Sequence, residues 1–155
     1  MLQRDVALSL RRFTLATLML GMVGIGTELG LIGHVESTQQ WIPLVLLALG
    51  VVVVAWHSVA PRAVTVRALQ GAMLLFVISG GVGVWLHFQG NRAFELEMYP
   101  SMTGRELVQK TMTGATPVLA PGSMALLGLI GLTHSYRHPS LQPDAVASRN
   151  KEGDS

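Results

Sequence analysis

The sequence contains no cysteine and few charged or aromatic residues, and the missing cysteine and charge each exclude a class of protein. Without cysteine the chain forms no disulfide, no thiolate zinc site and no iron–sulfur cluster, and it carries no thiol nucleophile. Only 13% of the residues are Asp, Glu, Lys or Arg, whereas soluble domains average about 25%. Hydrophobic residues make up 50% of the chain, and the mean hydropathy is +0.46. The composition therefore indicates a protein whose solvent is largely lipid.

Four long apolar segments account for this composition, at residues 13–33, 41–60, 68–90 and 114–136. A helix rises about 1.5 Å per residue and must cross about 30 Å of hydrocarbon, so a span needs about 20 apolar residues. Each segment is long enough, and a single segment satisfies its own backbone groups in lipid only as a helix. We expect an all-α integral membrane protein with four transmembrane helices in an antiparallel bundle.

The distribution of basic residues predicts how these spans are oriented, because cytoplasmic flanks carry an excess of Lys and Arg. One side of the predicted topology collects eight basic residues and the other collects three. The eight are Arg4, Arg11, Arg12, Arg62, Arg67, Arg137, Arg149 and Lys151, and the three are Arg92, Arg105 and Lys110. We therefore expect both termini in the cytoplasm and a multi-pass protein of the inner membrane of a bacterium.

The longest predicted loop, residues 91–113, lies on the outer side in this topology. Apolar and polar residues alternate over residues 94–99, a pattern typical of a short strand. Thr103 followed by Glu106 fits a helix-capping box. We expect a short amphipathic helix at residues 104–113, lying on the outer membrane surface.

Prolines interrupt the start of the fourth apolar segment. From Pro121 to His134 there are only 14 residues, too few to cross the bilayer alone. We expect either a helix that includes Pro117 or an unwound turn that packs against neighbouring helices. Residues 1–138 are predicted to form one transmembrane domain, and residues 139–155 a disordered polar tail.

Histidine is the one chemical group that recurs at the ends of the apolar segments. Because successive spans alternate in direction, two of these histidines belong to the outer face and two to the inner face. Imidazole pairs on alternate helices can hold a haem b, and imidazole with carboxylate suits zinc, iron or manganese. The outer-face pair is His34 and His87, and the inner-face pair is His57 and His134.

Only the outer pair has carboxylates nearby in the sequence, and this favours a metal site on that face. The acids in question are Glu28, Glu36, Glu95 and Glu97. The predicted metal ligands are Glu28, His34, Glu36 and His87. A different interpretation needs no cofactor, since a histidine at a helix C-terminus can hydrogen-bond the last carbonyls and meet the negative end of the helix dipole. A metal ion, a haem b and a helix-end role all stay open.

Glu28 and the glycines are the remaining features inside the spans. An intramembrane carboxylate normally faces the bundle interior, where it carries a proton, binds an ion or fixes helix packing by a hydrogen bond. Small residues allow helices to approach closely. Three glycine faces are predicted to pack against neighbouring helices: Gly21 with Gly24, Gly26 with Gly30, and Gly80 with Gly83.

Three functions are compatible with these features. The sequence contains no phosphate-binding loop, dinucleotide fingerprint, zincin motif or nucleophile elbow, so no catalytic residue is predicted. Its basic residues are dispersed at helix flanks, which argues against nucleic acid as a partner. The first function is a structural or accessory subunit that packs against a membrane partner or a second copy. The second is a membrane protein that binds a metal or haem at the outer face, and the third is a small proton-coupled transporter or channel component that uses Glu28.

Overall fold

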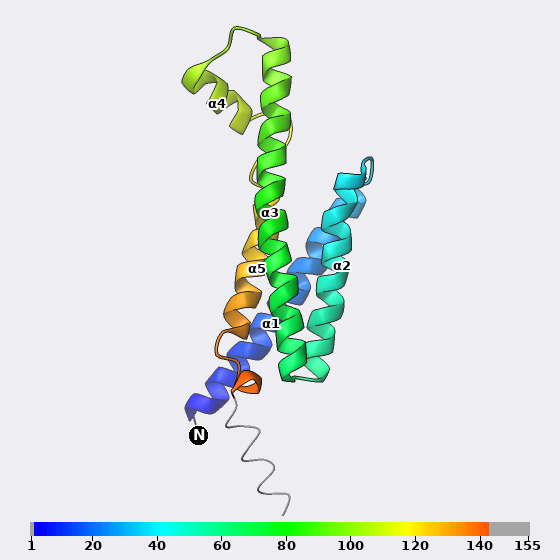
Figure 1. The fold of residues 1–155 in the computed structure, drawn as a ribbon, viewed down its shortest axis with the longest axis vertical. Helices are drawn as coiled ribbons and strands as arrows, with labels where there is room; N and C mark the ends of the chain where they lie inside the picture. The colour runs from blue at the N-terminus through cyan, green and yellow to red at the C-terminus, as the bar shows by residue number, and fades with distance from the viewer. Residues whose placement is uncertain (1, 143–155) are drawn as a thin grey trace, which may run out of the picture.

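The computed structural model describes residues 2–142, which are helical and contain no strand. The helices are α1 (Leu2–Leu31), α2 (Thr38–Val59), α3 (Ala63–Met98), α4 (Gly104–Met112) and α5 (Gly122–Ser135), followed by a short 3-10 helix at Pro139–Leu141. Figure 1 shows α3 as the long axis of the molecule, with α5 alongside it and α1 and α2 forming a neighbouring hairpin. Of the predicted disordered tail, residues 139–141 are helical and residues 143–155 lie outside the described part of the chain.

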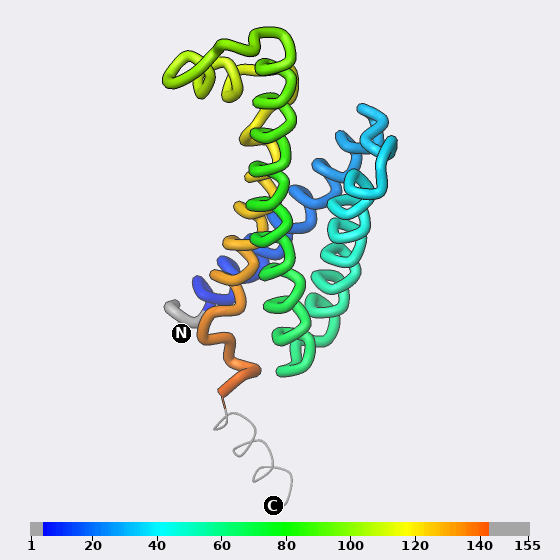
Figure 2. Tube along the Cα trace, turned by 45° about the horizontal axis from the view of Figure 1, so that its top comes forward, coloured from blue at the N-terminus to red at the C-terminus, as the bar shows by residue number. Residues whose placement is uncertain are grey.

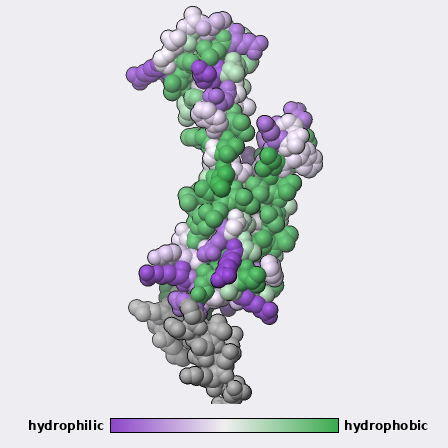
Figure 3. Space-filling model, viewed as in Figure 1, coloured by the Kyte–Doolittle hydropathy of each residue, from purple (hydrophilic) through white to green (hydrophobic). Residues whose placement is uncertain are grey.

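Three helices, α1, α2 and α3, are long and apolar enough to cross a membrane. The space-filling view supports this, because on the face shown apolar residues form a band across the middle and polar residues gather toward both ends (Figure 3). Of the two alternatives predicted for the start of the fourth apolar segment, the structure has the turn and not a helix that includes Pro117. Its helix, α5, has 14 residues and is therefore about 21 Å long, short of the roughly 30 Å of hydrocarbon.

The prolines explain why the fourth helix is short. The backbone around Pro117 and Pro121 forms turns, in which the amide of Ala120 donates to Pro117 O at 3.2 Å and that of Ser123 to Ala120 O at 3.1 Å. Proline has no N–H to donate and disfavours the α conformation of the residue before it. Regular α-helix therefore begins only at Gly122.

Helix α3 is longer than its predicted span, with 36 residues and a length of about 54 Å. The strand predicted for residues 94–99 is wrong, because the helix continues to Met98 and the Tyr99 amide still donates to Glu95 O at 2.8 Å. Glu, Leu and Met are good helix formers, and the described residues contain no strand that could pair with this segment. Pro100 follows directly and prevents further extension. Helix α4 covers Gly104–Met112, and its place on an outer membrane surface stays a prediction.

The core lies where α1, α2, α3 and α5 meet. Its largest fully buried apolar side chains are Phe76, Leu18, Met22, Leu69, Met73, Val54 and Val66. Glycine brings α3 and α5 together: a methyl group added at Gly128 would lie 2.6 Å from Met73 O, and one added at Gly80 would lie 2.8 Å from the Cβ of Ala125. These two helices therefore pack backbone to backbone.

The predicted glycine faces divide into packed and open positions. Gly21 lies against Leu127, and Gly80 and Gly83 both lie against Pro121. Gly26 has one neighbour, Leu47, at 4.0 Å, whereas Gly24 and Gly30 have no neighbouring atom within 4 Å. Among the predicted glycine faces, close packing is thus found on α3 and in the middle of α1.

Both views show that the two ends of the described part of the chain lie on the same side of the molecule (Figures 1 and 2). The start of α1, the connection between α2 and α3, and the end of α5 are found there. We call this the inner end, because the basic residues predict that it faces the cytoplasm. The opposite side, with the α1–α2 connection and α4, is called the outer end.

Candidate metal centre

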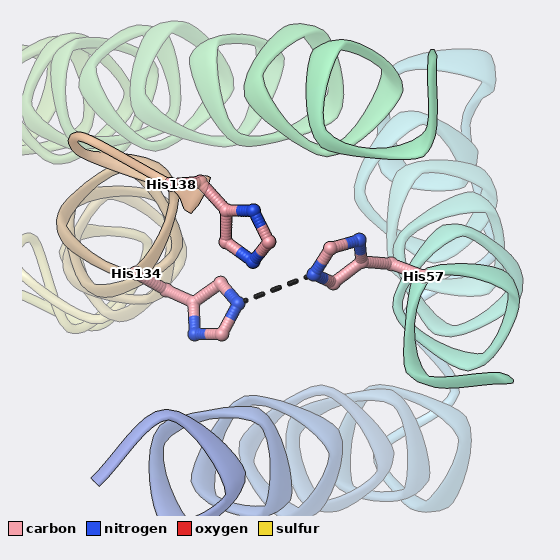
Figure 4. A group of neighbouring side chains, drawn as sticks. All are labelled: His57, His134 and His138. Carbon is pink, nitrogen blue, oxygen red and sulfur yellow. Dashed lines mark hydrogen bonds between the residues drawn. The ribbon is translucent and has the colours of Figure 1, made fainter. Parts of the chain in front are cut away.

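Three histidines converge at the inner end of the bundle. His57 lies in the last turn of α2, His134 in the last turn of α5, and His138 three residues beyond α5. All three are buried, with exposed fractions of 2%, 5% and 7%. One nitrogen from each ring lies within 4.8 Å of the other two. Figure 4 shows the three rings turned toward one another between the ribbons, and we call them the histidine triad.

A sharp change of backbone direction after α5 brings His138 back to His134. Arg137 has a φ of 45°, in the left-handed region that a residue with a Cβ rarely adopts. The turn is fixed on its far side by Ser140, whose hydroxyl donates to Pro61 O at 3.2 Å. The segment after α5 is therefore attached to the α2–α3 connection, next to the C-terminal end of α2.

The hydrogen bonds of Thr65 assign the protonation of His57. The Thr65 hydroxyl lies 2.9 Å from both Ala60 O and Arg62 O, so its single hydrogen goes to one of these carbonyls. Its oxygen then accepts from the Arg62 amide and from Nδ1 of His57, each at 3.0 Å. We assign the Nδ1–H tautomer to His57, because the Thr65 hydrogen can then go to Ala60 O while Arg62 O accepts from the Val66 amide, and the lone pair of Nε2 faces the centre of the triad.

His138 is uncharged at neutral pH. Burial in the first place, together with the positive charges of Arg11 and of a His57 imidazolium, lowers the pKa of His138 to about 4. Its Nδ1 accepts a hydrogen bond from the Ser140 amide at 3.2 Å. The nitrogen that faces the other two rings is therefore Nε2, as Figure 4 shows. A neutral imidazole is the form that binds a metal ion.

The spacing of two triad nitrogens matches that of ligands on a tetrahedral ion. Nε2 of His57 and Nε2 of His134 are 3.3 Å apart. Zinc–nitrogen bonds of about 2.0–2.1 Å place neighbouring ligand atoms of a tetrahedron about 3.3–3.4 Å apart. Axial ligands of a haem would lie on opposite sides of a macrocycle, about 4 Å apart. The His57 and His134 rings, at 83° to each other and at hydrogen-bond distance, leave no room for that plane. The geometry suits a single ion.

The four metal ligands predicted for the outer face do not form such a group. Over residues 2–142, the histidine triad is the only set of three or more His, Asp or Glu side chains with converging ligand atoms. Glu28 and Glu36 are exposed, and His34 lies in the turn that follows α1. His87 is not at a helix end as predicted, since α3 runs on to Met98, and its Nδ1 lies 3.0 Å from Pro117 O.

The sequence interpretation missed His138, although the spacing held a signal. His134 and His138 are four residues apart, the separation that places two imidazoles on one face of a helix and occurs in helical metal motifs. In the structure the helix ends at Ser135, so the two rings meet through a turn instead. The contribution of His57 from α2 depends on helix packing, which the sequence does not specify.

Comparison with known protein families, curated proteins and solved structures finds no match to this chain. The described fold places it among all-helical proteins with helices suited to cross a membrane. A functional assignment therefore rests on the geometry of the histidine triad and on the chemistry of its surroundings.

Proposed function

We propose that this chain is an integral membrane protein that binds a divalent transition-metal ion, zinc in the first place, at the histidine triad. The observation that carries the proposal is the convergence of three buried imidazoles whose ligand atoms lie within 4.8 Å of one another. A bound ion explains why three buried imidazoles converge, whereas helix packing alone does not require it.

The ligand set favours zinc and the neighbouring late transition metals. The triad offers only imidazole nitrogens, and no carboxylate belongs to the group. Imidazole suits zinc, copper, nickel and iron, whereas magnesium and calcium prefer oxygen ligands. Three protein ligands leave the fourth tetrahedral position open to water or to another molecule. Copper(II) and nickel bind the same donors, and the 3.3 Å spacing of His57 and His134 favours a tetrahedral ion.

The hydrogen bonds around the triad prepare two ligands differently. His57 is ready to bind, because Thr65 accepts from its Nδ1–H and so fixes the ring and its tautomer. His138 has to rearrange, because its Nδ1 accepts from Ser140 and the proton of the neutral ring therefore sits on Nε2. An ion that binds Nε2 therefore requires this proton to move to Nδ1, which keeps the ring neutral but turns Nδ1 from an acceptor into a donor. We therefore expect loss of the hydrogen bond from the Ser140 amide on metal binding.

A bound ion would cross-link three parts of the chain at the inner end. His57 comes from α2, His134 from α5 and His138 from the turn beyond α5. Ligands drawn from separate elements turn the free energy of metal binding into stability of their arrangement. The proposed role is thus a metal-dependent closure of the inner end, which suits an accessory membrane subunit as well as a metal-binding protein in its own right.

The proposed topology places both termini and the triad on the cytoplasmic side. The excess of basic residues in the flanks of this end supports the orientation. In this proposal residues 114–121 and α5 together make the fourth crossing, with the turns around Pro117 and Pro121 covered by α3. Glycines at positions 80 and 83 of α3 allow Pro121 to lie against that helix, which supports a buried irregular segment.

Cobalt substitution tests the proposal in purified protein in nanodiscs. After metal removal, one equivalent of Co²⁺ per chain is expected to produce the intense visible bands of a tetrahedral site. His134→Ala should abolish these bands, and His87→Ala, which changes a histidine outside the triad, should leave them intact. Unaltered bands in His134→Ala, or none in the parent protein, would leave the triad as a hydrogen-bonded packing cluster and refute a metal function.

A further inference from the structure

A cleft between α1 and α5 lies directly beside the histidine triad. It has a volume of about 240 Å³ and is lined by Ala7, Leu10, Arg11, Thr14, Thr133 and His134. Arg11 is fixed at one side, where its Nη1 donates to His134 O at 2.9 Å. Figure 4 shows the second ring nitrogen of His134, Nδ1, directed away from the triad and toward the blue ribbon of α1. This nitrogen is buried and has no hydrogen-bond partner in the described chain.

Within residues 2–142, no acidic side chain forms an ion pair with the cation at this cleft, Arg11. Arg11 is half-buried, and the acids nearest to it on α1 are Asp5, six residues earlier, and Glu28, about 25 Å further along the helix. A divalent ion in the triad would add two positive charges beside this guanidinium, with only neutral imidazoles as ligands. Buried charges are costly unless they are paired and hydrogen-bonded. The metal-loaded site therefore calls for an anion.

The position of the proton on His134 couples anion binding in the cleft to metal binding in the histidine triad. In the metal-free triad, Nε2 of His57 carries a lone pair, so Nε2 of His134 donates across the 3.3 Å between them and its Nδ1 is an acceptor. Once an ion takes Nε2 of His134, the proton of the neutral ring must sit on Nδ1. That nitrogen then becomes a donor directed toward α1, as metal-bound histidines commonly require of their outer nitrogen.

We propose that this cleft binds an oxyanion of phosphate type, which accepts hydrogen bonds from the Arg11 guanidinium and from Nδ1–H of metal-bound His134. The inference rests on the proposed metal function and extends it, because the anion acts as the outer partner of one metal ligand. By linkage, the anion strengthens metal binding and the metal strengthens anion binding by the same factor. Outer partners of this kind typically change metal affinity about 10–100-fold.

The phosphate-type oxyanion has two sources at a membrane, the phosphate of a lipid headgroup and a free phosphate ion. The cleft lies at the end of α1 where basic residues gather, the level at which anionic headgroups meet a protein. Zinc affinity is to be measured by competition with a chromophoric chelator, in phosphatidylcholine nanodiscs, in nanodiscs that also contain phosphatidylglycerol, and in phosphatidylcholine with inorganic phosphate. An increase of about tenfold with phosphatidylglycerol alone assigns a lipid, and an equal increase with inorganic phosphate assigns a free oxyanion.

Arg11→Gln should remove this increase, while Arg12→Gln, at the exposed neighbouring position of the same helix, should retain it. Where Arg11→Gln fails to fold, Arg11→Lys keeps a cation but loses the two-pronged donor, and the increase should shrink. Zinc binding of equal strength in all three settings overturns the anion site and leaves the metal function standing. Absence of zinc binding in every setting overturns both.

Discussion

The inner and outer ends of this molecule contrast in what they offer a ligand. The outer end has more residues of the metal-binding types, including Glu28, His34, Glu36 and His87, yet these do not converge. The inner end offers three imidazoles and no acid, and they meet. Figures 1 and 2 show the structural difference, since the start of α1, the α2–α3 connection and the end of α5 all lie on the inner side, while the α1–α2 connection and α4 lie apart from each other. Convergence of helices, rather than the number of ligand residues, creates the candidate site.

Replacing a ligand of the histidine triad tests the contrast between the two ends most directly. His57→Ala should reduce zinc affinity by more than the 10–100-fold that loss of an outer hydrogen-bond partner causes, because a ligand itself is lost. The matched change at the outer end, His34→Ala, should leave zinc affinity within experimental error. Titration of both variants against a chelator in nanodiscs provides the measurement, and equal losses in the two variants would refute the contrast between the ends.

Replacing Thr65 tests whether its hydrogen bond prepares His57 to bind metal at the inner end. Thr65→Val keeps the shape of the side chain but removes the acceptor for Nδ1–H of His57, so zinc affinity should fall about 10–100-fold. Thr65→Ser keeps the hydroxyl and should retain most of the affinity. If valine and serine behave alike in the same titration, Thr65 does not orient His57.

Helix packing differs between Gly128, where α3 and α5 touch, and Gly24, which has no neighbouring atom, and this difference does not depend on metal. Gly128→Ala places a methyl group 2.6 Å from Met73 O, between α3 and α5, and should destabilise the protein by about 1–3 kcal/mol. Gly24→Ala adds the same group where no atom lies within 4 Å, and alanine favours helix, so stability should be unchanged or rise by up to about 1 kcal/mol. Unfolding midpoints in detergent compare the two, and a larger loss for Gly24→Ala would contradict the packing described here.

The smallest effect is expected at the turn that positions His138. Arg137 occupies a left-handed conformation with φ 45°, which costs a residue with a Cβ about 1–2 kcal/mol. Arg137→Gly should relieve part of this cost and stabilise the metal-free protein by up to about 1 kcal/mol, whereas Arg137→Ala should bring no such gain. A stabilisation by alanine as large as that by glycine would mean that the side chain, not the backbone, is responsible.

The sequence was informative about membrane-spanning length and less so about the local ends of helices. Three apolar segments correspond to α1, α2 and α3, because about 20 apolar residues in lipid have few alternatives to a helix. The prolines at positions 117 and 121 predicted an interrupted start of the fourth segment as one of two alternatives, and the structure has that form. Helix α3 exceeds its predicted span because helix formers continue beyond the apolar residues.

The candidate site was harder to predict because it depends on two features that leave weak sequence signals. One is the left-handed turn at Arg137, where glycine would be the usual residue, which returns His138 to the end of α5. The other is the packing of α2 near α5, which brings His57 within 3.3 Å of His134. Because acids lie near His34 and His87 in the sequence, the metal site was predicted at the outer face. Helix packing does not bring those residues together there.

X-ray absorption at the zinc edge tests the metal centre most directly, since it reports the ligands themselves. Zinc-loaded protein in nanodiscs should show a four-coordinate shell with nitrogen at about 2.0–2.1 Å and the outer-shell scattering of three imidazole rings. The His57→Ala protein should lose one ring or the metal. A zinc shell made only of oxygen atoms, or an unchanged imidazole count in His57→Ala, would contradict a metal site at the histidine triad.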